Sequence, residues 1–375
     1  MANVCALNNY PLRKMWELAE QGTVPRQHLW GVDGLAAAGH AVAIAPFHEP
    51  HERQLLDRVS VRSRRLLGHL DQEAYALRRL GAADVLYCAD QNGLAGLALA
   101  RGLLPEVRLI SVVHHRVRGA IRRSAAARHD VLVCLSETLA AELRRDLHRS
   151  RPRIVHLPWG PDLSWPRYRP RGESHGVVSA GKSNRDLHTL ATALRISGAP
   201  GLVYDLAGQL PEPPNRDVRL VRPGDVAGVD PDAPGQYLAT KAIEDVAAAS
   251  VVAVPILDSA RLTGLTEVAD AIALGKPVIV SRSPYFPFDI EAVGCGIWVE
   301  PQDANGWACA ISGLLSDDRA RTEMGIAGRR FAERHWNYER FSQGLGALIS
   351  RRPEQREPPS TPSARGTPAS GCCRD

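Results

Sequence analysis

Short apolar runs alternate with amphipathic segments along the first half of the chain. The apolar runs are spaced as strands of a mostly parallel sheet, because longer segments with helical periodicity separate them. The predicted strands are 4–7, 41–45, 84–88, 108–113, 130–135 and 153–157. Helices are predicted at 29–38, 73–80 and 137–145. This half of the chain therefore reads as one α/β domain.

The same alternation restarts after a segment rich in proline and glycine. Residues 159–172, WGPDLSWPRYRPRG, contain five prolines and glycines and predict an irregular connection. The strands predicted beyond it are 176–180, 201–207, 250–255, 277–280 and 296–299. The helices predicted there are 187–196, 236–249, 266–273, 304–315 and 317–335. We therefore expect an α/β fold with two Rossmann-like domains whose parallel sheets face a central cleft.

The predicted domain boundaries follow from these patterns. Residues 1–165 form the first domain and residues 166–337 the second. A terminal helix over 338–350 is expected to pack back on the first domain. From residue 351 to 375 the chain turns to Pro, Ser, Thr, Arg and Gly, which predicts a disordered tail. A length of 375 residues also favours two domains over one core.

Composition excludes several classes of protein. Seven cysteines without metal-ligand spacing indicate a reducing compartment and no zinc site. No apolar stretch approaches 18 residues, and the N-terminus lacks a signal-peptide core, so a cytoplasmic location is predicted. There is no G-x-G-x-x-G after the first strand, no Walker A motif and no G-x-S-x-G elbow. We expect neither a metal nor a cofactor.

A helix N-terminus in the second half carries the first candidate chemistry. The segment TGLTEVADAIALGKPVIVSR, residues 263–282, reads as a loop, a helix and a buried strand. Backbone N–H groups of Gly264, Leu265 and Thr266 are candidates to bind an anion, because a helix N-terminus presents unpaired donors and a positive dipole. Glu267 and Asp270 then are candidates to accept from sugar or ribose hydroxyls. The alternative is an ordinary crossover with solvated acids.

A second candidate is the turn after the first strand of the second half. In SAGKSNRD, residues 179–186, Gly181 allows close approach of the backbone to a ligand. Lys182 and Arg185, three residues apart, have the charge to flank a diphosphate. The alternative is that both cations are solvated.

These two segments resemble the retaining GT-B glycosyltransferases of the GT4 group. SAGKSNRDLHTLATAL is similar to that group's strand–loop–helix with two cations, and TGLTEVADAIALGKPVIV to its G-L-T…E-A-M-A-x-G-K-P-V-I signature. Further matches are SETLAAELRRD, IVHLPWGPD, YDLAGQ, VVAVPILDS, GIWVEPQDANGWACAISGLL and MGIAGRRFAERHWNYERF. Their order and spacing match over residues 130–345 and more loosely over 1–115.

The resemblance implies a metal-independent transferase with a nucleotide-sugar donor in the second domain and a hydroxyl acceptor. Lys182 and Arg185 lie where the group places its diphosphate-binding cations, and Asp270 where it places a ribose-binding glutamate. The chain departs from the group at Leu262, where a second glutamate is usual. Asp258 and Glu267 are the nearest acids that can substitute, although a first-turn Glu267 also suits the helix dipole by itself.

On the acceptor side the candidates are three histidines. The resemblance implies that His114 or His115, at the end of a predicted strand, contacts the transferred sugar or its phosphate. It also implies an acceptor contact for His28, in the loop before the first predicted helix. The alternatives are a solvated strand end, and a helix N-terminal residue near a packed Trp30.

Basic residues gather at 53–65 and 116–128 with apolar residues between them. They suit amphipathic helices on an anionic membrane that bears a lipid-linked acceptor; solvated helix faces are the alternative. Nucleic acid is not an expected partner, because no recognised module accompanies the charge. Two other functions stay open: a non-hydrolysing nucleotide-sugar epimerase, and a GT-B module that binds without turnover.

Overall fold

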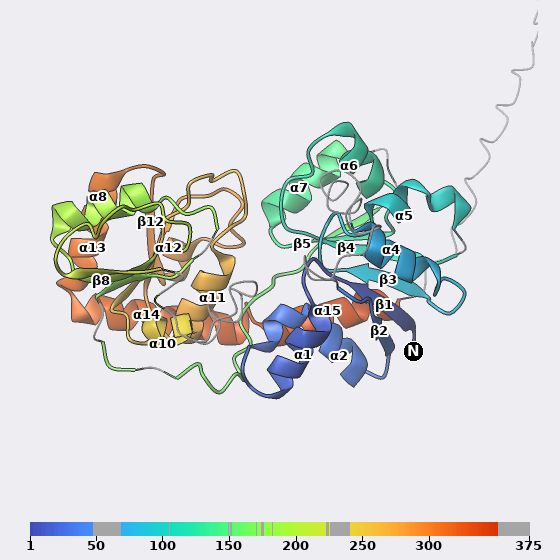
Figure 1. Ribbon diagram of the computed structural model, residues 1–375, viewed down its shortest axis with the longest axis horizontal. Helices are drawn as coiled ribbons and strands as arrows, with labels where there is room; N and C mark the ends of the chain where they lie inside the picture. Colours follow the sequence, from blue (N-terminus) through green and yellow to red (C-terminus); the bar gives the residue numbers. More distant parts are fainter. Residues whose placement is uncertain are drawn as a thin grey trace, which may run out of the picture.

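Two parallel sheets form the framework of the protein. The computed structural model describes residues 1–47, 69–104, 106–148, 150, 152–169, 171–173, 176–181, 183–222, 225 and 241–351. Their named strands form two six-stranded sheets in which all pairings between strands are parallel. Figure 1 shows two lobes, each with helices on both faces of its sheet. The predicted two-domain α/β fold is confirmed.

The first sheet has the order β2-β1-β3-β4-β5-β6. Its strands are β1 (Asn3–Leu7), β2 (Ala41–Ile44), β3 (Val85–Cys88), β4 (Arg108–Val113), β5 (Val131–Cys134) and β6 (Arg153–His156). The helices of this domain are α1 (Leu12–Glu20), η1 (Arg26–Leu29), α2 (Val32–Ala37), α4 (Leu70–Leu77), α5 (Ala95–Leu99), η2 (Arg101–Leu103), α6 (Ala120–Ala126) and α7 (Glu137–Asp146). The interior strands β3 and β5 are buried throughout, as expected for a sheet covered on both faces.

The second sheet has the order β12-β11-β10-β7-β8-β9. Its strands are β7 (Val177–Ser179), β8 (Gly201–Tyr204), β9 (Val218–Val221), β10 (Val251–Val254), β11 (Val278–Ser281) and β12 (Gly296–Val299). Its helices are α8 (Leu187–Ser197), α10 (Ile243–Ala247), α11 (Leu265–Ala273), α12 (Ile290–Val293), α13 (Ala304–Leu315) and α14 (Asp318–Arg334). The last helix, α15 (Tyr338–Ser350), follows α14 directly. In the described part of the chain no helix is long and apolar enough to cross a membrane.

The sequence predictions of elements are confirmed in outline and wrong in places. Every predicted strand overlaps an observed one, but β9 was not predicted, because Arg219 interrupts its short apolar run. The helix predicted at 29–38 begins only at Val32, since Trp30 and Gly31 adopt left-handed backbone angles (φ 53° and 82°) that end η1. The basic segment 53–65 and the tail beyond residue 351 lie outside the described residues, as does part of the helix predicted at 236–249.

Helix α15 carries the chain from the second domain back to the first, where it packs against α2 (Figure 1). The Tyr338 hydroxyl accepts a hydrogen bond from the Gly31 N–H at 3.0 Å and donates one to Asp33. A side chain at Gly34 would collide with Ser342, so α2 and α15 approach closely there. The Arg108 guanidinium donates to carbonyls at the end of α15, which places a cation at the negative end of the helix dipole.

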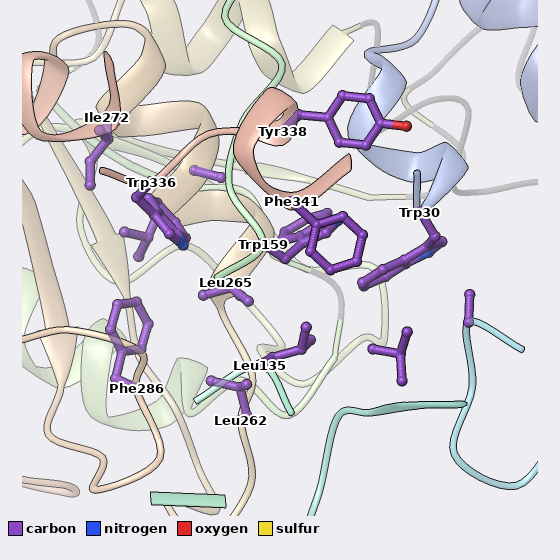
Figure 2. Close-up of a cluster of buried hydrophobic side chains, with 14 of the residues drawn as sticks. Trp30, Leu135, Trp159, Leu262, Leu265, Ile272, Phe286, Trp336, Tyr338 and Phe341 are labelled. Atoms are coloured by element: carbon purple, nitrogen blue, oxygen red, sulfur yellow. The ribbon is translucent and has the colours of Figure 1, made fainter. Parts of the chain in front are cut away.

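One buried apolar cluster contains residues from both domains. Trp30 of the first domain stacks on Trp159 of the connection at 5.0 Å between ring centroids, and Phe341 of α15 meets Trp30 edge-on at 6.1 Å. The same cluster includes Leu135 at the end of β5 and Leu265 of α11 (Figure 2). The domains therefore share an apolar contact where η1 meets the connection, residues 159–172, a region that we call the hinge. The chain also crosses between the domains twice.

A buried carboxyl in the first domain gives a testable dependence of stability on pH. Glu73 of α4 is 4% exposed and accepts a hydrogen bond from the Gly96 N–H at 2.8 Å; burial raises its pKa to about 8. The folded state therefore holds a proton that the unfolded chain releases near pH 4.5, so this contribution to stability is lost as pH rises through about 8. We expect Glu73→Gln to flatten the fall in unfolding free energy between pH 5 and 8.5, measured by urea denaturation. An unchanged pH dependence would contradict this assignment.

Candidate active site

The candidate residues of the second domain gather where its strand order reverses. The chain runs from β7 outward to β8 and β9, then returns to add β10 on the other side of β7. In open α/β sheets, ligands bind outside the carboxyl ends of the strands at such a switch point. The loops that leave β7 and β10 there contain Gly181 and Gly264. Lys182 itself lies outside the described residues.

Asn184 joins these two loops. Its backbone is left-handed (φ 55°), and its Nδ2 donates to the Thr263 Oγ1 at 3.0 Å and to the Asp258 carbonyl at 3.1 Å. The Asp258 N–H donates in return to the Asn184 Oδ1 at 3.1 Å. The sequence interpretation did not single out Asn184, although asparagine is the common non-glycine residue in this backbone region. The two predicted walls of the pocket are therefore held as one unit.

A buried ion pair lies beneath the β7–α8 loop. Arg185 and Glu267 are 6% and 7% exposed, and the guanidinium donates to the Glu267 carboxylate. The other carboxylate oxygen of Glu267 accepts from the Ala180 N–H at 3.1 Å. Burial lowers the pKa of Arg185 to about 10, which leaves it charged at neutral pH. Of the two cations predicted to flank a diphosphate, Arg185 is thus compensated by an acid, and Glu267 is not a solvated first-turn carboxylate.

Gly181 lies directly over this pair. A Cβ at position 181 would lie 2.1 Å from the Arg185 Nε and 2.3 Å from a Glu267 carboxylate oxygen. The glycine is therefore needed for the close packing of the loop on the ion pair, apart from any ligand.

The N-terminus of α11 has no side-chain cap. Gly264 is the N-cap residue with a left-handed backbone (φ 80°), and among the described residues no side-chain cap accepts a hydrogen bond at this end of the helix. Leu265 is buried and Thr266 is exposed. Leu262, where the GT4 group has an acid, is 6% exposed within the apolar cluster. Asp258 is half-buried and pairs with Arg261 at 3.2 Å.

Asp270, one turn further along α11, contacts the connection between the domains. Its Oδ1 accepts a hydrogen bond from the Tyr168 hydroxyl at 2.6 Å. Burial raises the pKa of Asp270 to about 7, although hydrogen bonds from Tyr168 and Gln27 act in the opposite direction. The sequence interpretation did not find Tyr168 or Gln27, because both contacts join residues more than a hundred positions apart.

Two histidines follow β4 on the facing domain. The backbone N–H groups of His114 and His115 both donate to the Gln91 Oε1, at 3.0 and 2.8 Å. The His114 Nε2 lies 2.6 Å from the Ala89 carbonyl, so this nitrogen carries the proton and Nδ1 is left as an acceptor. Burial lowers the pKa of His114, so its ring is neutral.

The pKa of His115 depends on charges from both domains. Burial lowers its pKa to about 4, and the charges of His114 and of Arg261 from the second domain act in the same direction. Asp90, which follows β3, opposes them. Asp90 also lies 3.8 Å from the His69 Nε2, and burial raises its pKa. The sequence interpretation did not name Asp90. Its position just after an apolar strand could have identified it, because polar residues at the carboxyl ends of parallel strands often belong to ligand sites.

His28 lies in η1, at the hinge. Its ring is 6.4 Å from Trp159 between centroids, and burial lowers its pKa to about 4. The Tyr10 hydroxyl donates to the His28 carbonyl. His28, His114 and His115 are therefore all neutral rings at physiological pH.

A second contact between the domains involves α7. The Tyr285 hydroxyl, from the loop after β11, donates to the Glu142 Oε1 at 3.1 Å. Arg116 pairs with the other oxygen of Glu142 at 3.5 Å. The amphipathic helix expected over 116–128 is shorter than that segment: α6 begins at Ala120 and ends at Ala126.

The packing of Gly181 on the ion pair can be tested by substitution. Gly181→Ala should lower the unfolding free energy by about 1–3 kcal/mol, the usual cost of overpacking a filled site. Gly172→Ala is the matched control, since a Cβ there meets no atom of the described residues within 4 Å. Urea denaturation of both variants measures the difference. Equal stabilities would show that the loop adapts without displacing Arg185.

No protein family model matches the sequence. The GDP-mannose-dependent alpha-(1-6)-phosphatidylinositol monomannoside mannosyltransferase of Mycolicibacterium smegmatis is 33% identical over 88 residues, 24% of this chain and 23% of that protein. This chain spans between about a quarter and two fifths of the length of the curated relatives that it matches.

Solved structures match over nearly the whole chain. Sucrose-phosphate synthase from Thermosynechococcus elongatus has a TM-score of 0.67 at 17% identity, covering 92% of this chain and 98% of that one. The Anabaena protein Alr3699/HepE in complex with UDP-glucose has a TM-score of 0.64 at 14% identity, covering 93% and 100%. The chain has the GT-B fold of glycosyltransferases, and its sequence resembles their GT4 group.

Proposed function

We propose that this protein is a glycosyltransferase that moves a sugar from a nucleotide-diphosphate donor to a hydroxyl acceptor. The observation that carries the proposal is the joining of the Gly181 loop to the uncapped N-terminus of α11 at the switch point of the second sheet. Such a place offers backbone N–H groups to a diphosphate. The mannosyltransferase relative is named as GDP-mannose-dependent, and the HepE structure holds UDP-glucose, which supports a nucleotide-sugar donor.

The donor phosphates would meet the N–H groups of Gly264, Leu265 and Thr266 together with Lys182. Charge that develops on the departing diphosphate is stabilised by donors already in position. Arg185 would mainly hold the loop in place and contribute little charge to the diphosphate, because its guanidinium is already paired with Glu267. We propose retention of configuration, with the donor phosphate oxygen accepting the proton of the acceptor hydroxyl, and no metal or cofactor. We assign Asp258 to the sugar end and Asp270 to the ribose end of this pocket.

The acceptor and the transferred sugar would lie against the first domain. A neutral His114 with Nδ1 as an acceptor suits a hydrogen bond from a sugar hydroxyl. The charge of Arg261, from the second domain, acts on the pKa of His115 in the first, so we propose that the transferred sugar binds near both residues. His28 would contribute at the hinge side. Closure of the domains around the ligands would exclude water and limit hydrolysis of the donor.

Donor binding is the decisive test. We expect one of UDP-, GDP- or ADP-sugars, at about 100 times its Kd, to stabilise the fold by ~2.7 kcal/mol, a rise of about 5–10 °C in melting temperature. Lys182→Ala should weaken that binding about tenfold or more, as expected for a lost charge-assisted hydrogen bond. Lys14→Ala, at an exposed position of α1, is the control.

The outcomes separate the remaining functions. Stabilisation by no nucleotide sugar would count against the proposal. Binding without transfer or hydrolysis across many acceptors would favour a non-catalytic module, for which the apolar Leu262 in place of an acid is the supporting feature. Arg185→Ala is unsuitable for this test, because it leaves Glu267 buried without its cation.

We further propose peripheral contact with an anionic membrane through the β4–α6 region. Arg118 and Arg123 are exposed there beside Ile121, which is 46% exposed. The lipid named in the mannosyltransferase relative is consistent with such a contact.

Arg123→Ser should lower binding to phosphatidylglycerol vesicles about fivefold, since one basic residue near such a surface contributes ~1 kcal/mol. Arg195→Ser, on α8 of the other domain, is the control in a co-sedimentation assay. Vesicle binding that neither variant changes would contradict this surface.

A further inference from the structure

A chain of hydrogen bonds joins three parts of the molecule at the hinge. The Gln27 Nε2 donates to the Tyr168 hydroxyl at 3.0 Å, and that hydroxyl donates to the Asp270 Oδ1 at 2.6 Å. Gln27 belongs to η1 of the first domain, Tyr168 to the connection and Asp270 to α11 of the second domain. Gln27 is fully buried and Tyr168 is 7% exposed. The contact therefore spans the domain boundary inside the protein.

At the Gln27 end of this series of hydrogen bonds, two further hydrogen bonds hold the residue. The Asp162 N–H donates to the Gln27 Oε1 at 2.6 Å, and the Trp159 indole donates to the Gln27 carbonyl at 3.0 Å. Both partners lie in the connection between the domains. The side chain of Gln27 therefore has one orientation, and it sits next to His28 in the same short helix. A shift of the connection would move η1 with it.

The Asp270 end lies on the helix that would bind the donor. Asp270 lies on α11, and the backbone N–H groups of the first residues of this helix are the proposed hydrogen-bond donors to the diphosphate. The Asp270 carboxylate accepts a hydrogen bond from Tyr168. A ribose hydroxyl that donates to this carboxylate would compete with the Tyr168 hydroxyl for the Asp270 Oδ1. Burial raises the pKa of Tyr168 well above its usual value, so the phenol remains protonated and available as the donor.

We propose that Gln27 and Tyr168 are positioning residues, which set the angle between the domains through Asp270 and compete with the nucleotide for that carboxylate. Nucleotide binding at α11 then releases Tyr168 and loosens the hold of Gln27 on the connection. Donor occupancy is thereby communicated to η1 and His28. The competition with a nucleotide rests on the proposed function; the control of the domain angle does not.

The test compares two buried tyrosines that donate to an aspartate. Tyr168→Phe removes the bond across the domains, while Tyr204→Phe removes the bond from Tyr204 to Asp245 within the second domain. We expect Tyr168→Phe alone to speed amide hydrogen exchange in residues 159–168 and in η1 at least tenfold and to change the radius of gyration in solution scattering. A similar response in both variants, or none in either, would overturn the proposal.

The nucleotide arm uses UDP and GDP with their 2′,3′-dideoxy analogues in calorimetric titrations. Tyr168→Phe should tighten binding of the hydroxyl-bearing nucleotide about fivefold, because it removes an internal competitor worth one ordinary hydrogen bond. The dideoxy analogue should gain nothing. Equal changes for both nucleotides would overturn the competition. If the unsubstituted protein binds neither nucleotide, the proposed function fails, and hydrogen exchange and scattering still decide whether the hinge contact sets the domain angle.

Discussion

The buried ion pair between Arg185 and Glu267 is the interaction on which the candidate donor pocket depends. It joins the loop after β7 to the first turn of α11, and Glu267 also receives the Ala180 N–H. A buried pair is costly to break, because removal of one partner leaves an uncompensated charge in a low-dielectric interior. The proposed anion-binding site is therefore supported by residues that need not touch the ligand. This pair explains why a glycine must lie above it.

The two domains are connected by chemistry of two kinds. Aromatic rings around Trp30 and Trp159 give an apolar contact that resists separation but tolerates sliding. Hydrogen bonds between Tyr168 and Asp270, and between Tyr285 and Glu142, have defined directions and fix a single orientation. The contact between the domains therefore combines apolar packing, about which they can turn, with polar contacts that favour one orientation.

The sequence predicts the framework far better than the site. Strand and helix periodicity is local, so the paired α/β halves and the segment containing α11 follow from neighbouring residues alone. The partners of Arg185 and Asp270 do not, because Glu267 and Tyr168 are 82 and 102 positions away. A cation after a strand and an acid in a first helical turn each have a complete local explanation, and only the fold brings them into contact. Likewise, the left-handed Trp30 is set by its tertiary contacts and has no local signal.

The return of α15 to the first domain has a consequence for how the chain is made. Tyr338 completes the hydrogen bonding of Gly31 and Asp33, more than 300 positions earlier in the sequence. During synthesis the first sheet emerges from the ribosome long before the helix that covers α2 exists. The surface of α2 around Gly34 packs against Ser342 of α15. It therefore stays exposed to water until α15 has been translated. The final maturation of the first domain is therefore coupled to the completion of the second.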